Sequence, residues 1–125
     1  MNAFNDAERE YLQGARRLGR LATVGADGMP HVVPVSFRYN ADLDTIDVGG
    51  HGFATGKKYR DVQQNPRAAI VIDEIVSVSP WRVRGVEIRG HVEILETDGT
   101  SLGPGFDAEM FRITPRRVVS WGLTD

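Results

Sequence analysis

The stretch Val83–Leu95, V-R-G-V-E-I-R-G-H-V-E-I-L, carries the clearest strand pattern in this sequence of 125 residues. Apolar and polar side chains alternate along it, with Val86, Ile88, Val92 and Ile94 in one set and Glu87, Arg89, His91 and Glu93 in the other. Successive side chains of a strand point to opposite faces, so the alternation predicts one buried and one exposed face. Gly90 lies in the middle, where a bend or bulge would let the sheet curl.

Further short strands, separated by turn residues, are predicted on both sides of this stretch. They are expected at 20–24, 30–39, 45–48, 68–73 and 111–122, with Pro115 at a break in the last one. The segment 75–81 fits either a continued strand or a loop. In the strand 30–39, Pro34 cannot donate a ladder hydrogen bond, which indicates an edge, a bulge or an opening at that point. One face of that strand is expected to carry Val33, Val35, Phe37 and Tyr39, and the other Val32, Pro34, Ser36 and Arg38.

Two short helices complete the predicted elements. Asn5 and Glu8 form a capping box that starts the first, and Gly19 is expected to end it. Its apolar face would carry Ala7, Tyr11, Ala15 and Leu18. The second begins near Gly56 and ends at Asn65-Pro66, because the residue before a proline is biased away from helix.

This order of elements predicts a mainly β fold. Six short strands with close turns and two or three short helices indicate a closed or partly closed antiparallel barrel, formed by one domain over residues 1–125. No alternating βαβ pattern is present, which disfavours a doubly wound sheet.

Composition excludes several classes of function. The net charge is −2, whereas a general nucleic-acid binder is normally more basic. The absence of cysteine excludes disulfides and thiolate metal sites. The N-terminus lacks the apolar core of a signal peptide, and no apolar run is long enough to span a bilayer. We therefore expect a cytoplasmic protein with neither a nucleic-acid nor a membrane partner.

The stretch Gly49–Pro66, G-G-H-G-F-A-T-G-K-K-Y-R-D-V-Q-Q-N-P, contains the strongest candidate for a binding site. Thr55 suits the N-cap of the second helix, which would place Lys57 and Lys58 in its first turn. Cations are disfavoured there by the helix dipole, and a bound anion would resolve the conflict. On spacing alone, two solvated surface lysines explain the pattern slightly better than an anion site does.

Other chemical motifs are missing. A P-loop needs glycine where His51 stands and a hydroxyl where Lys58 stands, and no dinucleotide fingerprint follows a strand. The three histidines lack metal-ligand spacing, and His91 on an outer strand face is typical of a solvated residue. No side-chain nucleophile is evident, so an enzyme of this sequence would depend on a cofactor.

Several pieces, in order from Leu21 onward, resemble the pyridoxamine 5′-phosphate oxidase-like superfamily of split β-barrels. The pieces are L-A-T-V-G-A-D-G-M-P-H-V-V-P-V-S-F, T-G-K-K-Y-R-D-V-Q-Q-N-P-R-A-A-I-V-I-D, V-E-I-R-G-H-V-E-I-L and F-R-I-T-P-R-R-V-V-S-W-G. The sequence is most similar to the actinobacterial branch of flavin/deazaflavin oxidoreductases of the B type. The resemblance implies a homodimer with two cofactors in clefts between the subunits, and a small-molecule substrate.

The resemblance also implies a function and a set of cofactor contacts. The activity would be hydride transfer between the deazaflavin coenzyme F-420 and a small unsaturated substrate. The alternatives are an FMN-dependent oxidoreductase and a cofactor carrier without turnover, and some relatives are linked to haem or biliverdin-like ligands. Lys58 would contact the cofactor phosphate, Ser36 would lie nearest the ring system and phosphoribityl chain, and Gly49 would lie near the ring edge. The full predicted set is Pro34, Val35, Ser36, Gly50, His51, Thr55, Lys57 and Lys58, with no metal ligand and no identifiable catalytic side chain.

Overall fold

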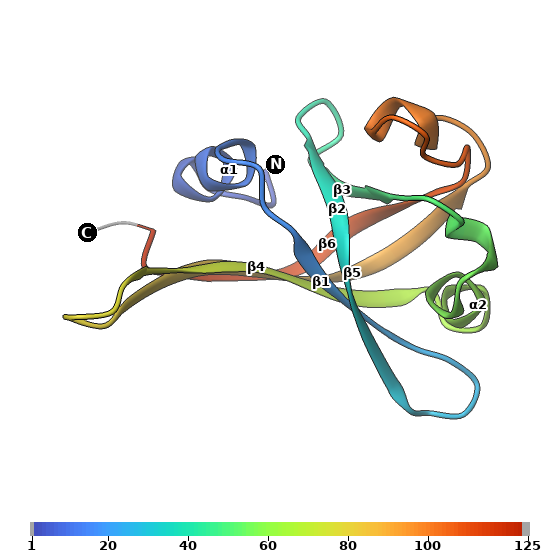
Figure 1. The fold of residues 1–125 in the computed structure, drawn as a ribbon, viewed down its shortest axis with the longest axis horizontal. Coiled ribbons are helices and arrows are strands. Elements are labelled where there is room, and N and C mark those ends of the chain that lie inside the picture. Colours follow the sequence, from blue (N-terminus) through green and yellow to red (C-terminus); the bar gives the residue numbers. More distant parts are fainter. Residues whose placement is uncertain (1, 124–125) are drawn as a thin grey trace.

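The computed structural model describes residues 2–123 and shows a closed six-stranded antiparallel barrel (Figure 1). The strands are β1 (Gly19–Val24), β2 (Pro30–Asn40), β3 (Thr45–Gly49), β4 (Arg67–Ser77), β5 (Arg82–Leu95) and β6 (Met110–Trp121). Around the barrel they follow the order β1-β2-β3-β6-β5-β4. The predicted fold class is therefore confirmed. Residues 1, 124 and 125, which belong to the predicted domain, lie outside the described residues.

The inner face of the barrel holds the hydrophobic core. The expected alternation is present in β5, where Val86, Ile88 and Val92 are buried, and in β2, where Val35 and Tyr39 are buried. The segment 75–77, left open by the sequence, continues β4. Fully buried Leu21, Ile46, Ile70, Ile113 and Phe111 bring every other strand into the same core.

The pairing of β5 with β6 contains a bulge that explains the mid-strand glycine. Arg89 pairs with Arg117 and Gly90 with Pro115, so Arg116 is the extra residue and the bulge belongs to β6. A Cβ on Gly90 would overlap the carbonyl oxygen of Thr114. The predicted irregularity at Gly90 is confirmed, but the inserted residue lies in the partner strand.

The first helix, α1 (Asp6–Gln13), is shorter than predicted. Its capping box is confirmed, because Asn5 accepts from the Glu8 amide at 2.8 Å and Glu8 accepts from the Asn5 amide at 2.9 Å. The prediction that Gly19 ends the helix is wrong, because Gly14 is the C-cap and Gly19 begins β1. At Gly19 a Cβ would lie 2.7 Å from the Ile70 side chain, so glycine is required there by close strand packing.

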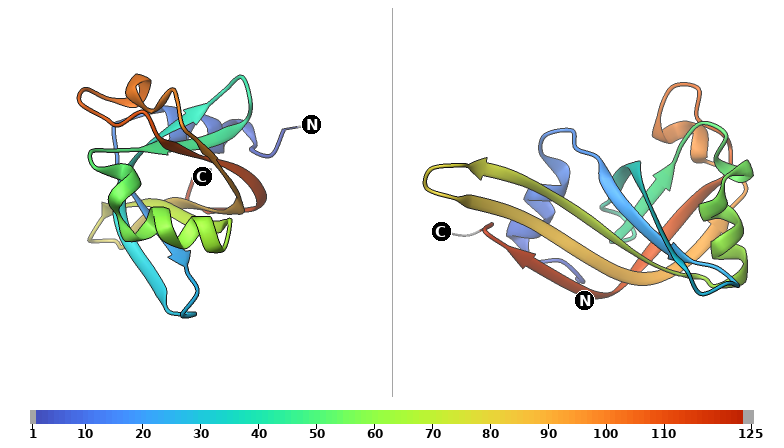
Figure 2. Two further views of the ribbon diagram at one scale, coloured as in Figure 1. Left: turned by 90° about the vertical axis from the view of Figure 1, so that its right-hand side faces the viewer. Right: turned by 60° about the horizontal axis from the view of Figure 1, so that its bottom comes forward.

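One end of the barrel is covered by the segment that follows β3. The 3₁₀-helix η1 (Phe53–Thr55) leads into α2 (Lys57–Gln64), and another 3₁₀-helix, η2 (Gly99–Leu102), lies between β5 and β6. Figures 1 and 2 show α2 at one end of the molecule, while the β4–β5 hairpin projects from the opposite end. Within residues 2–123 no helix is long and apolar enough to cross a bilayer.

Candidate functional site

The outer face of β2 and the glycine-rich turn after β3 are brought together by strand pairing. Ser36 pairs with Gly49, which leads directly into Gly50 and His51. The side chains of Pro34 and Ser36 are exposed on the outer face. The pairing therefore brings these predicted site residues close together, although Gly49 itself is buried against the Leu102 side chain.

Val35 differs from its predicted neighbours on the same strand. Its side chain is only 6% exposed and belongs to the core cluster. Because side chains alternate along a strand, Val35 can face a ligand on the outer surface only through its backbone.

The turn Gly50–Phe53 is held by the loop that precedes β6. The Asp107 amide donates to the Gly50 carbonyl at 2.9 Å, and an Asp107 carboxylate oxygen accepts from the Phe53 amide at 2.8 Å. His51 Nδ1 lies 2.9 Å from the Gly105 carbonyl oxygen, which can only accept, so Nδ1 donates in this hydrogen bond. The exposed imidazole is thus fixed in orientation at the edge of the turn.

The start of α2 differs from the prediction in its cap. Gly56, in an extended conformation, is the N-cap, and no side chain caps the helix. The Thr55 hydroxyl instead donates to the Gly52 carbonyl at 2.9 Å within the 3₁₀ turn, so the prediction that Thr55 caps α2 is wrong. The first N–H groups of a helix have no acceptor within the helix, and at the start of α2 no side-chain oxygen accepts a hydrogen bond from them.

Lys57 has a partner within the protein. Its Nζ lies 2.8 Å from Asp61 Oδ1, one turn further along α2, and the second Asp61 oxygen accepts from the Thr23 hydroxyl at 2.9 Å. These hydrogen bonds, the one from Lys57 above all, lower the pKa of the buried Asp61 carboxyl. The conflict of Lys57 with the helix dipole is therefore offset internally and does not call for an external anion.

Lys58 is in a different position. Its Nζ lies 4.8 Å from the centroid of the Phe53 ring, and among residues 2–123 it has no carboxylate partner. Burial lowers the pKa of this ammonium group. An anion beside Nζ would favour the charged form, and the uncapped amides of the same helix end would attract the same anion. Of the two lysines, Lys58 is the one whose surroundings suit an anionic ligand.

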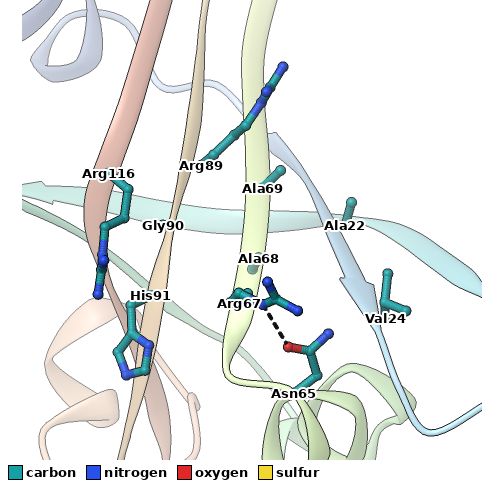
Figure 3. Close-up of a pocket in the computed structure, with 10 residues that line it drawn as sticks. All are labelled: Ala22, Val24, Asn65, Arg67, Ala68, Ala69, Arg89, Gly90, His91 and Arg116. Carbon is teal, nitrogen blue, oxygen red and sulfur yellow. Dashed lines mark hydrogen bonds between the residues drawn. The ribbon is translucent and has the colours of Figure 1, made fainter. Parts of the chain in front are cut away.

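Four residues that the sequence did not predict as part of a binding site surround a cavity of about 600 Å³ on the outer face of β1, β4 and β5 (Figure 3). They are Arg67, Arg89, His91 and Arg116. Arg89 and His91 share β5, whereas Arg67 lies on β4 and Arg116 on β6, so the register of the sheet brings the three strands' residues together. The alternation in β5 placed Arg89 and His91 on one exposed face, and it was the only available signal.

This architecture defines a class of protein. A closed six-stranded antiparallel barrel with a short helix at one end agrees with the split β-barrel fold that the sequence predicts. The chain belongs to the pyridoxamine 5′-phosphate oxidase family, whose model matches residues 4–121.

Similar proteins include a reductase and several solved structures. The chain is 43% identical over 120 residues to the 5a,11a-dehydrotetracycline/5a,11a-dehydrooxytetracycline reductase of Streptomyces rimosus, covering 96% of this chain and 84% of the relative. A conserved hypothetical protein of Mycobacterium tuberculosis has the same fold, with a TM-score of 0.73, 22% identity and coverage of 97% and 86% of the two chains. A solved F420 reductase matches with a TM-score of 0.67 and 22% identity, over 88% of this chain and 94% of the other.

Proposed function

We propose that this protein is a reductase that transfers a hydride between the deazaflavin coenzyme F-420 and a small unsaturated substrate. The observation that carries the proposal is the 43% identity, over 96% of the chain, to a reductase named for two dehydro compounds. The prefix "dehydro" denotes a compound that gains two hydrogens on reduction. A hydride together with a proton from solvent saturates one such double bond.

The residues present fit an anionic, ring-bearing cofactor. Lys58 and the uncapped amides at the start of α2 would hold its phosphate. The exposed outer face of β2, with Pro34 and Ser36, would lie against the ring system, and Gly50 allows close approach at the ring edge. When bound, this group supplies the hydride chemistry, which the described side chains do not supply themselves.

The chain's own residues would bind and orient. The Ser36 hydroxyl and the His51 imidazole would supply polar contacts beside this surface, and the loop through Asp107 keeps the turn in place. The reaction is favoured by holding donor and acceptor in a fixed geometry. Solvent is the proposed proton source.

A homodimer forms part of the proposal, with the cofactor between the subunits. The β4–β5 hairpin exposes a group of large apolar side chains, namely Ile75, Val76, Val78, Trp81 and Val83. Trp81 is 63% and Val78 73% exposed. Exposed apolar patches of this kind mark protein interfaces.

Two alternatives are distinguished by one titration series. Purified protein is titrated with F-420 and with FMN, and binding is followed by absorbance and fluorescence. Binding of F-420 at micromolar concentration, followed by oxidation of reduced F-420 in the presence of a dehydro acceptor, supports the proposal. Preferential binding of FMN would support the flavin-dependent alternative. Binding of F-420 with no acceptor able to reoxidise it would indicate a carrier.

A further inference from the structure

The cavity outside β1, β4 and β5 differs in charge from the protein as a whole. The chain has 17 acidic side chains against 15 lysines and arginines. Among the ten described residues that line the cavity, three are arginines, one is His91, and none is acidic. A concave surface lined by one sign of charge concentrates ligands of the opposite sign.

Most of this positive charge is not neutralised within the protein. Arg116 and His91 form no hydrogen bond or ion pair with any residue between 2 and 123. Arg67 donates only to the neutral amide oxygen of Asn65, at 3.1 Å. Arg89 is the exception, since it is paired with Glu87 through two hydrogen bonds of 3.1 and 3.2 Å. The cavity therefore retains donors for an external anion.

The bulge in β6 places Arg116 at this cavity. As the residue inserted opposite Arg89–Gly90, it leaves the regular alternation of the strand. Figure 3 shows the Arg116 and His91 side chains extending in the same direction on one side of the floor, while Arg67 turns toward Asn65 on the other. Bulges of this kind redirect a side chain, and here the redirected group is a cation.

The floor between these basic side chains consists of small and apolar residues. Arg89 pairs with Ala69, Ala69 with Ala22, and Ala22 with Val32 on β2. The cavity floor is thus continuous with the outer face of β2 that carries Pro34 and Ser36. A flat ring can lie on such a floor, and about 600 Å³ is within the range of small-molecule sites.

We propose that this cavity binds the substrate, and that the substrate is a flat, fused-ring compound bearing an acidic group held by Arg116. This inference deepens the proposed reductase function and rests on it. Lys58, in the first turn of α2, and Asn65, the C-cap that lines the cavity, are about 10 Å apart along the helix, so the cavity lies at the other end of α2 from the position proposed for the cofactor phosphate.

The test uses anthraquinone-2-carboxylate as the probe and 2-(hydroxymethyl)anthraquinone as its neutral counterpart. Binding to the full chain without cofactor is measured by calorimetry. The carboxylate should bind about tenfold more tightly than the alcohol, a preference that Arg116→Gln should abolish while leaving binding of the alcohol unchanged. Arg117→Gln is the matched control, because it removes the same charge from an exposed neighbour that does not line the cavity. It should change either affinity less than about twofold.

Several results would overturn the inference. Equal affinity for the two probes, or equal effects of Arg116→Gln and Arg117→Gln, would exclude an anion site at Arg116. If Arg116→Gln does not fold, Arg67→Gln on β4 provides the same comparison. Competitive displacement of the probe by F-420 would assign the cavity to the cofactor and not the substrate. If the protein binds neither F-420 nor FMN but still binds the probe through Arg116, the cavity is an anion site and the proposed reductase function is refuted.

Discussion

Asp61 accepts from Lys57 Nζ at 2.8 Å with one carboxylate oxygen and from the Thr23 hydroxyl at 2.9 Å with the other. This carboxylate therefore joins the start of α2 to β1 at the covered end of the barrel. It also separates the roles of two adjacent lysines, because Lys57 is committed to the fold while Lys58 is not.

The Lys57–Asp61 contact predicts a specific loss of stability in acid. Because hydrogen bonding lowers the pKa of Asp61 in the folded state, its stabilisation is full above the unfolded-state pKa of about 3.9 and is lost as the pH falls through the folded-state pKa. Denaturant unfolding of the wild type should show this loss below about pH 4. Asp61→Asn should reduce stability at pH 7 and flatten the acid limb. An unchanged acid limb in that variant would contradict the assigned role.

The two lysines should respond differently to truncation. Lys58→Ala should weaken cofactor binding by roughly 1–3 kcal/mol, the range for a lost charge-assisted hydrogen bond, with little change in stability. Lys57→Ala should lower stability, because it leaves the buried Asp61 carboxylate with only the Thr23 hydroxyl. Cofactor titration and thermal unfolding of both variants provide the comparison. Equal cofactor affinity in wild type and Lys58→Ala would show that Lys58 is a solvated lysine.

Tyr39 should determine part of the alkaline behaviour. Burial, together with its 2.6 Å hydrogen bond to Asp44, raises the pKa of Tyr39 to about 12. A folded-state pKa above the unfolded value gives stability that is present below about pH 10 and is lost as the pH rises toward 12. Absorbance at the tyrosinate band, followed alongside circular dichroism, should show Tyr39 ionising last or only on unfolding. In Tyr39→Phe the loss of stability at alkaline pH should be smaller. The prediction would be contradicted if one tyrosine of the folded wild type ionises near pH 10 and this ionisation is missing from Tyr39→Phe.

The exposed hairpin should control oligomeric state. Replacing Trp81 and Val78 with aspartate should convert the proposed dimer to monomer, because charges would be buried in an apolar contact. Sedimentation velocity on the wild type and the double variant measures this directly. Leu43→Asp is the control, since Leu43 is 54% exposed in the distant β2–β3 turn. A wild-type monomer, or dissociation of the dimer by Leu43→Asp alone, would refute the assignment of the interface to this hairpin.

The fold could be predicted from the sequence because its strands have one buried and one exposed face. The sequences of β2 and β5 alternate so regularly that their side chains could be divided correctly between the two faces. Local helix ends were less predictable. Gly19 has the character of a helix stop, but its small size is required by the Ile70 side chain on another strand. Thr55 is a good capping residue that instead serves the preceding 3₁₀ turn.

The candidate site was predictable only where its residues are close in sequence. Lys57 and Lys58 were recognised as a pair, but their division of roles depends on Asp61 and Thr23, which the fold supplies. The cavity around Arg116 could not be predicted, because its cations come from three places in the chain and meet only through strand register.

The inserted residue in β6 also determines which of the later side chains of this strand face the core. Before Arg116 the odd-numbered Phe111 and Ile113 face the core, whereas after it the even-numbered Val118 and Ser120 face inward. That change of phase brings the Ser120 hydroxyl within 2.6 Å of Glu8, in the capping box of α1. Substitution of Arg116 therefore keeps this arrangement and removes the charge. Deletion of the residue would exchange the inward and outward side chains at the end of β6, and the hydrogen bond from Ser120 to Glu8 of the N-terminal helix would be lost. The fold requires an additional residue at this position but not an arginine. The Arg116 side chain is therefore available for the ligand contact proposed above.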